Sequence, residues 1–246
     1  MAEGQRQGFY EAFWEDRDYT LAYAMDAARR ERFPAIRAVW GPLPPPRRVL
    51  DYGCGNGALS ARMFANGFGA ELVGVDLSAT AVASARERFA GPGLSFETLE
   101  PEHPLAALGA LGAFDAVVCC HVLEHLAAPA EALAALSALA PWLVLEVPLE
   151  RCLVQDALAR LRARERRDNP VGHVQFWDRA GFGRLLAEQG LEIVRQHHYA
   201  AAPFSPYTGA LKRRLERGAL ALLGTARYGR LMATHYCVLA RRAAGA

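Results

Sequence analysis

The chain has 246 residues, a formal net charge of +2, 52% hydrophobic residues and 22% charged residues. This balance is typical of one globular domain with a full hydrophobic core, and it excludes disordered and fibrous proteins. The longest apolar stretch without a charge, residues 132–145, is too short for a membrane span. Residues 1–18 lack the apolar segment of a secretory signal, so we expect a cytoplasmic protein.

The cysteines are odd in number and form no CxxC pair, a pattern that predicts reduced thiols rather than disulfides or structural zinc. They are Cys54, Cys119, Cys120, Cys152 and Cys237. The net charge is close to neutral, which argues against a nucleic-acid partner.

The N-terminal region is predicted to be helical. Residues 8–40 carry aromatic side chains at roughly helical spacing, among them Phe9 and Phe13, and then an arginine-rich stretch that ends at Trp40. This pattern predicts two helices. Four prolines between residues 42 and 46 end the region, because consecutive prolines cannot continue a helix.

From residue 47 the pattern changes to short apolar runs that alternate with helical stretches. Such alternation predicts a parallel β-sheet with helices on both faces. The predicted strands are 49–53, 71–76, 94–99, 114–120 and 142–147, and the predicted helices are near 58–66, 79–90, 103–110 and 129–139.

Two further strands and a helix are predicted near the C-terminus. Asp178 is a typical N-cap for a helix that runs to about Gln189 and ends at Gly190. Residues 191–199 and 234–242 are typical of strands. The segment between them, residues 200–233, is an insertion with a basic amphipathic helix around residues 208–223.

A glycine-rich loop, residues 51–57 (DYGCGNG), follows the first strand and opens a helix. Its glycines let the backbone approach a ligand closely, and the helix start offers unpaired N–H groups. Gly53-x-Gly55-x-x-Ala58 also satisfies the dinucleotide fingerprint. Asp76, at the end of the second strand, is placed to accept hydrogen bonds from both hydroxyls of a ribose, whether the ligand is a dinucleotide or another nucleoside.

Three features favour a cationic ligand over a dinucleotide at this loop. Asp51 ends the first strand, just before the glycines of the loop, where its charge opposes a pyrophosphate but suits a cationic ligand. The loop follows about forty residues of helix, and FDAVVCCHVLEHL (114–126) occupies the fourth strand and its turn. From Val49 to Arg242 the chain resembles the class I S-adenosylmethionine (SAM) dependent methyltransferases, especially the branch with ubiquinone-pathway O-methyltransferases and small-RNA 3′-end methyltransferases.

The resemblance implies a single α/β domain with a Rossmann-like, doubly wound sheet of seven strands, mostly parallel with an antiparallel last strand. Residues 1–46 would form a helical lid, 47–199 the SAM-binding core, and 234–246 the last strand and tail. The insertion at 200–233 could be a lid, a homodimer contact or a membrane-surface helix. Asp76 would hold the ribose hydroxyls. The other implied cofactor-binding residues are Asp51, Gly53, Cys54, Gly55, Asn56, Gly57, Leu77, Leu99, Glu100 and Cys119.

His121, Glu124 and His125 would share one face if the turn after the fourth strand were helical, because they are spaced i, i+3 and i+4. Two imidazoles and a carboxylate can bind a divalent metal or transfer protons. Together with His173 they resemble the metal-binding positions of the two branches. His121 stands where those proteins often have Glu, so three imidazoles would favour Mn²⁺ or Zn²⁺ over Mg²⁺. The alternative is a structural role, with Glu124 in a salt bridge and His125 packed under the sheet edge.

Methyl transfer from a sulfonium is a direct displacement, so the protein mainly aligns the two reactants. A hydroxyl acceptor must also lose a proton, which His125, His173 or His121 could assist as catalytic residues. We expect O-methylation of a small molecule. The alternatives are N-methylation of an amine or peptide, 2′-O-methylation of RNA, a catalytically silent SAM-binding scaffold and, more distantly, an NAD-dependent enzyme.

Overall fold

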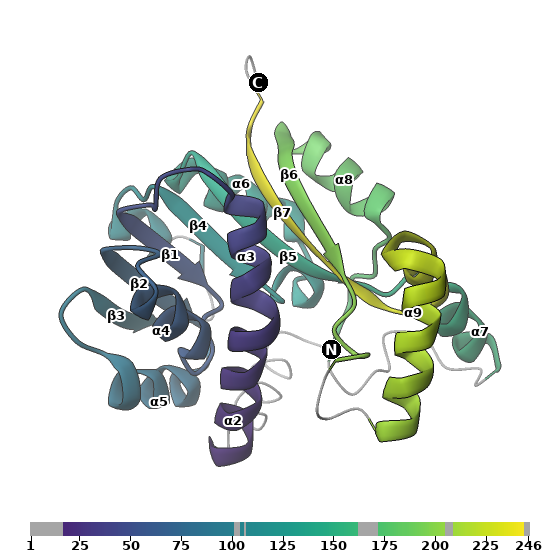
Figure 1. Ribbon diagram of the computed structural model, residues 1–246. Helices are drawn as coiled ribbons and strands as arrows, with labels where there is room; N and C mark the ends of the chain where they lie inside the picture. Colours follow the sequence, from purple (N-terminus) through teal and green to yellow (C-terminus); the bar gives the residue numbers. More distant parts are fainter. Residues whose placement is uncertain (1–16, 101–103, 106, 162–171, 205–208, 244–246) are drawn as a thin grey trace.

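The computed structural model describes residues 17–100, 104–105, 107–161, 172–204 and 209–243. Within these residues seven strands form one sheet in the order β3-β2-β1-β4-β5-β7-β6 (Figure 1). Strands β1 to β5 are parallel, and β7 is antiparallel to both β5 and β6. The predicted Rossmann-like architecture is confirmed. The strands are β1 Arg48–Tyr52, β2 Glu71–Asp76, β3 Leu94–Thr98, β4 Ala116–Cys120, β5 Trp142–Leu149, β6 Leu191–Tyr199 and β7 Thr234–Arg242.

The central strands are apolar on both faces, as expected for parallel strands covered by helices on both sides. Every residue of β4 is buried. The chain moves outward from β1 to β3 and then returns to β4 on the other side of β1. Ligands in open α/β sheets bind beyond the carboxyl ends of the strands at such a reversal, so a ligand site is expected at the ends of β1 and β4.

Helices α3 (Phe33–Trp40), α4 (Ala58–Ala65) and α5 (Ala79–Phe89) cover one face of the sheet, and α6 (Pro129–Leu139) and α8 (Arg179–Glu188) cover the other (Figure 1). Two caps follow the sequence. Ser78 Oγ accepts from the Ala81 N–H of α5 at 3.1 Å, and Asp178 Oδ1 accepts from the Gly181 N–H of α8 at 2.6 Å. The helix predicted near 103–110 is wrong where it is described: residues Ala107–Leu111 form a short 3₁₀ helix.

The predicted break between two N-terminal helices is absent from residue 17 onward. Helix α2 (Arg17–Ala27) continues through a π-helical turn (Ala28–Arg32) directly into α3, which gives one rod along the sheet (Figure 1). An apolar face of Ile36, Val39 and Trp40 buries this rod against the sheet. Phe9 and Phe13 lie outside the described residues.

The insertion between β6 and β7 contains a longer helix than predicted. Helix α9 spans Ala210–Leu231 and is kinked at Gly224, whose φ of 69° is not helical. It leaves Leu211, Leu215 and Leu222 exposed, and it packs near α7 (Leu153–Leu161) and β6. No helix among the described residues is both long enough and apolar enough to cross a membrane.

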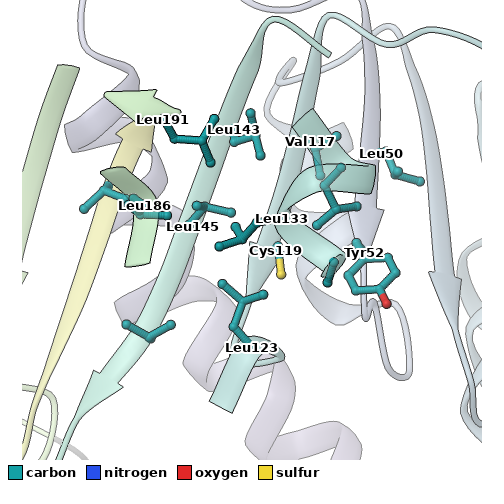
Figure 2. Close-up of a cluster of buried hydrophobic side chains, with 14 of the residues drawn as sticks. Leu50, Tyr52, Val117, Cys119, Leu123, Leu133, Leu143, Leu145, Leu186 and Leu191 are labelled. Atoms are coloured by element: carbon teal, nitrogen blue, oxygen red, sulfur yellow. The ribbon is translucent and has the colours of Figure 1, made fainter. Parts of the chain in front are cut away.

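The two faces of the sheet bury separate hydrophobic cores. One packs α3, α4 and α5 against the sheet. The other packs α6 and α8 against β1, β4 and β5 and holds Cys119 beside Tyr52, Leu123 and Leu133 (Figure 2). All five cysteines are buried free thiols, which confirms the prediction that they form no disulfides.

Candidate functional site

The glycine loop closes tightly over the end of β1. Gly53, Gly55 and Gly57 have φ values of 78°, 53° and 77°, in the left-handed region that favours glycine. The N–H groups of Gly53 and Cys54 donate to the Val75 carbonyl at 2.8 and 3.0 Å. The loop is therefore fastened to β2 before α4 begins at Ala58.

Asp76, at the end of β2, holds the loop from the side. Its Oδ2 accepts from the Gly55 N–H at 2.8 Å, and its Oδ1 accepts from the Ser78 N–H at 2.9 Å. The Leu99 N–H donates to the Asp76 carbonyl at 2.9 Å, which brings the end of β3 to the same place. A half-buried carboxylate thus lies beside the loop, as a ribose-binding acid requires.

The remaining predicted cofactor residues surround this loop in different environments. Leu99 is buried, Leu77 is half-buried against the core, and Glu100 is exposed after β3. Cys54 is buried, and the Nδ2 of buried Asn56 has no hydrogen-bond partner among the described residues. An unpaired buried donor within the loop fits a site that a polar ligand completes. Cys119 is fully buried in the core under the loop rather than lining it with its thiol.

Asp51 is a buried carboxylate directly in front of the loop, with 1% of its surface exposed. Ser60 Oγ donates to its Oδ2 at 2.5 Å. Burial raises the pKa of Asp51 to about 6, against the lowering effect of the Ser60 hydrogen bond and of the Arg32 charge. A carboxylate buried at this cost is one that a cationic ligand would stabilise.

The turn after β4 is not the helical face that its spacing predicts. His121 has a φ of 57°, a left-handed conformation unusual for a non-glycine residue, and only Leu123–His125 form a 3₁₀ turn. His121 and His125 therefore point into two different groups of side chains. The turn is pressed against the glycine loop, because a Cβ added to Gly53 would lie 2.2 Å from Val122 Cγ2.

The first group, which we call the His121 cluster, contains His121, Glu124, Glu146, His235 and Tyr199. Glu124 and Glu146 are fully buried and contact opposite ring nitrogens of His121, Nδ1 at 3.1 Å and Nε2 at 2.9 Å. His235 Nδ1 lies 3.2 Å from His121 Nε2, and the Tyr199 hydroxyl donates to Glu146 Oε1 at 2.7 Å.

These contacts set opposite charge states for the two histidines. Burial acts to lower the pKa of His121, but the bonds to Glu124 and Glu146 outweigh it and raise the pKa to about 9. Burial lowers the pKa of His235 to about 3, and the charge of His121 adds to that effect. Burial would raise the pKa of Glu146, yet His121 outweighs burial and brings it to about 2. Without a ligand, the cluster is an imidazolium between two carboxylates.

The second group, the His173 cluster, contains His125, His173, Glu150 and the same Glu124. His173 Nδ1 donates to Glu150 Oε2 at 2.7 Å, and the rings of His125 and His173 meet edge to face with centroids 4.8 Å apart. His125 Nδ1 donates to the Gly172 carbonyl at 3.4 Å. Burial lowers the pKa of His125, which keeps it neutral near pH 7. A carboxylate that orients an imidazole is the arrangement of a general base.

The structure divides the four residues predicted as one metal site. Glu124, His125 and His173 bring ligand atoms within 4.8 Å of one another, whereas His121 does so with Glu146 and His235. The segment that carries His173 is joined to the turn through backbone bonds, because the Val174 and Gln175 N–H groups donate to the Glu124 carbonyl at 2.8 and 3.0 Å.

Four residues of these clusters were missed by sequence reasoning: Glu146, Glu150, Tyr199 and His235. The signal available for Glu146 was a carboxylate inside the apolar run WLVLEV, since a charge is rarely buried in a strand without a partner. His235 and Tyr199 gave no local signal, because pairing of β7 with β5 and β6 is what brings them to Glu146.

Comparisons with known proteins agree on one family. Residues 13–196 match the family model described as a methyltransferase domain. A ubiquinone biosynthesis O-methyltransferase of Burkholderia pseudomallei (strain 1710b) is 32% identical over 170 residues, which cover 65% of this chain and 71% of that protein.

Two solved structures share the fold at low identity. A methyltransferase in complex with the Haloferax volcanii Trm112 methyltransferase activator has a TM-score of 0.58 at 17% identity, covering 95% of this chain and 94% of that one. Phosphoethanolamine N-methyltransferase 2 of Haemonchus contortus, in complex with phosphomonomethylethanolamine and S-adenosylhomocysteine, has a TM-score of 0.61 at 14% identity. The match covers 96% of this chain and 60% of that one.

Proposed function

The chain belongs to the class I SAM-dependent methyltransferases, and from this premise we propose that it methylates a hydroxyl group of a small molecule. When bound, SAM would supply the methyl group of its sulfonium, and the acceptor oxygen would bond to that carbon in one step with S-adenosylhomocysteine as the leaving group. The protein then has two tasks, to hold the two reactants in line and to take the hydroxyl proton.

The glycine loop and the acids beside it are proposed to hold SAM. Asp76 is proposed to accept hydrogen bonds from the ribose hydroxyls, and Leu77, Leu99 and Glu100 are proposed to contact the adenine. Asp51 is proposed to stabilise the positive charge of the methionine part and its sulfonium. Burial of Asp51 supports this role, because a cation at the loop would offset the cost that raises its pKa to about 6.

His173 is proposed as the base that takes the acceptor proton. The observation that carries this assignment is the 2.7 Å bond from His173 Nδ1 to Glu150, which fixes the orientation of the ring. His125 packs edge to face against His173 and links it to the turn that contacts the glycine loop through Val122. His121 is not proposed as a base, because Glu124 and Glu146 already occupy both of its ring nitrogens.

The pair of His173 and Glu150 favours an oxygen acceptor over a nitrogen acceptor. A neutral amine attacks a methyl group without prior loss of a proton, so it has little use for a carboxylate-supported imidazole. The relative from Burkholderia pseudomallei carries the name of an O-methyltransferase. We therefore propose a phenolic or other acidic hydroxyl as the acceptor group.

The test is SAM turnover on matched acceptors, measured as release of S-adenosylhomocysteine. A panel of catechols and hydroxybenzoates is compared with the corresponding anilines and benzylamines. We expect turnover on the hydroxyl series, and we expect His173→Ala to lower kcat about 10²- to 10⁴-fold on it. Turnover confined to the amines, and indifferent to His173→Ala, would overturn the proposal.

A further inference from the structure

The His121 cluster has no role in the proton transfer proposed above, yet it gathers two imidazoles and a buried carboxylate at one point. We propose that His121 Nε2, Glu146 Oε1 and His235 Nδ1 form a binding site for a divalent transition metal ion of the zinc type. This site is distinct from Glu124, His125 and His173.

The three atoms lie close enough together to bind one ion. His121 Nε2 lies 2.9 Å from Glu146 Oε1 and 3.2 Å from His235 Nδ1, and the third separation, from His235 Nδ1 to Glu146 Oε1, is 3.8 Å. Two ligands that each lie about 2.1 Å from one ion are at most about 4.2 Å apart. All three separations are below that limit, so one ion can reach the three atoms with little movement.

The sheet itself holds the ligands in place. His121 follows the last residue of β4, Cys120, which pairs with Glu146 of β5. Glu146 also pairs with Cys237 of β7, two residues from His235, and His235 faces Pro148. Three adjacent strands therefore fix the three side chains, which is the rigid support that a metal site needs.

Partners behind the ligands complete the arrangement. Glu124 Oε1 lies 3.1 Å from His121 Nδ1, the ring nitrogen away from the proposed ion, as in carboxylate–histidine–metal triads. The Tyr199 hydroxyl donates to Glu146, and its ring stacks on His235 with centroids 5.2 Å apart. Glu146 is fully buried, and its Oε2 has no hydrogen-bond partner among the described residues, so this carboxylate can accept a further positively charged partner.

The donor set selects the class of ion. Two imidazole nitrogens and one carboxylate oxygen suit Zn²⁺ and its neighbours, whereas Mg²⁺ and Ca²⁺ prefer oxygen ligands throughout. Three protein ligands also leave a fourth position open, as in catalytic rather than structural zinc sites. Binding replaces the proton on His121 Nε2, which passes to solvent.

The experiment measures ion binding to the full chain after chelator treatment, in the absence of SAM and acceptor. Zn²⁺ is titrated by calorimetry, and Co²⁺ is followed by its visible absorption, which reports coordination geometry. We expect one ion per chain. Glu146→Gln and His235→Ala should each weaken binding by more than about 100-fold, because a ligand costs more than the outer partners of a metal site.

Two further variants make the result decisive. His173→Ala, a matched histidine of the other cluster, should keep wild-type affinity. Tyr199→Phe keeps the ring on His235 and removes only the hydroxyl, so it should weaken binding about 10- to 100-fold without a risk to folding. The proposal is overturned if the wild type binds neither ion, or if His173→Ala abolishes binding while His235→Ala does not. The readout needs no turnover, so it is independent of the proposed O-methylation.

Discussion

Val122 packs so closely over Gly53 that even one added methyl group could not fit between them, since its carbon would lie 2.2 Å from Val122 Cγ2. The contact joins the two parts of the site. Gly53 opens the loop proposed to hold SAM, and Val122 lies between His121 and the turn that carries His125. The residues proposed to bind the cofactor and those proposed to take the acceptor proton thereby lie at one edge of the sheet, at the ends of β1 and β4.

Gly53→Ala should therefore lower both the stability of the protein and its binding of the cofactor. Both the φ of 78° and the Val122 contact oppose an alanine there, so we expect a lower Tm and loss of the Tm increase caused by S-adenosylhomocysteine. Gly67→Ala is the matched control, because Gly67 has a φ of 70° but no atom within 4 Å of the added carbon. It should lose only about 1–2 kcal/mol and keep cofactor binding. Adding Val122→Ala to Gly53→Ala should restore part of the loss; no recovery would contradict the proposed contact.

The buried Asp51 is expected to lower the stability of the cofactor-free protein at high pH and to strengthen cofactor binding. Its pKa is about 6 in the fold and near 3.8 when unfolded, so the fold favours the protonated form. The stability that this provides is present below pH 3.8 and is lost as pH rises through 6. Asp51→Asn should thus stabilise the cofactor-free protein at pH 8, by no more than about 3 kcal/mol, and have little effect at pH 4.

The same variant should bind SAM more weakly, because the proposed partner of the sulfonium has lost its charge. Chemical denaturation at the two pH values and calorimetry with SAM measure the two effects. Ser60→Ala serves as the companion variant: it removes the hydrogen bond that lowers the pKa of Asp51 and should extend the loss of stability to higher pH. Equal effects of Asp51→Asn at pH 4 and pH 8 would contradict this account.

Glu150 is expected to act through His173 rather than on the acceptor. Glu150→Gln weakens the charged hydrogen bond to Nδ1 and should lower kcat about 10- to 100-fold on a hydroxyl acceptor, with little change in KM. A change in KM alone, with kcat intact, would argue that Glu150 acts on acceptor binding rather than through His173.

The succession of strands along the chain and most of their bounds could be predicted, because they depend on local patterns. Strands at 191–199 and 234–242 match the prediction residue for residue, and Asp178 caps its helix as expected. The turn at His121 could not be predicted from spacing, because a left-handed residue directs His121 and His125 into different clusters. The contact between Glu146 and His235, which are 89 positions apart, could not be predicted either. It depends on the insertion of β7 between β5 and β6.

The central claim is that the loop and the acid at the end of β2 bind SAM. Calorimetry with SAM on the wild type, Asp76→Ala and Asp115→Ala tests it most directly. Both aspartates accept two backbone N–H groups, those of Gly55 and Ser78 at Asp76 and those of Arg47 and Arg48 at Asp115, so both variants lose equivalent hydrogen bonds. We predict that Asp76→Ala weakens SAM binding by more than about 10-fold and that Asp115→Ala leaves it unchanged. Wild-type affinity in Asp76→Ala, or an equal loss in both variants, would contradict the account.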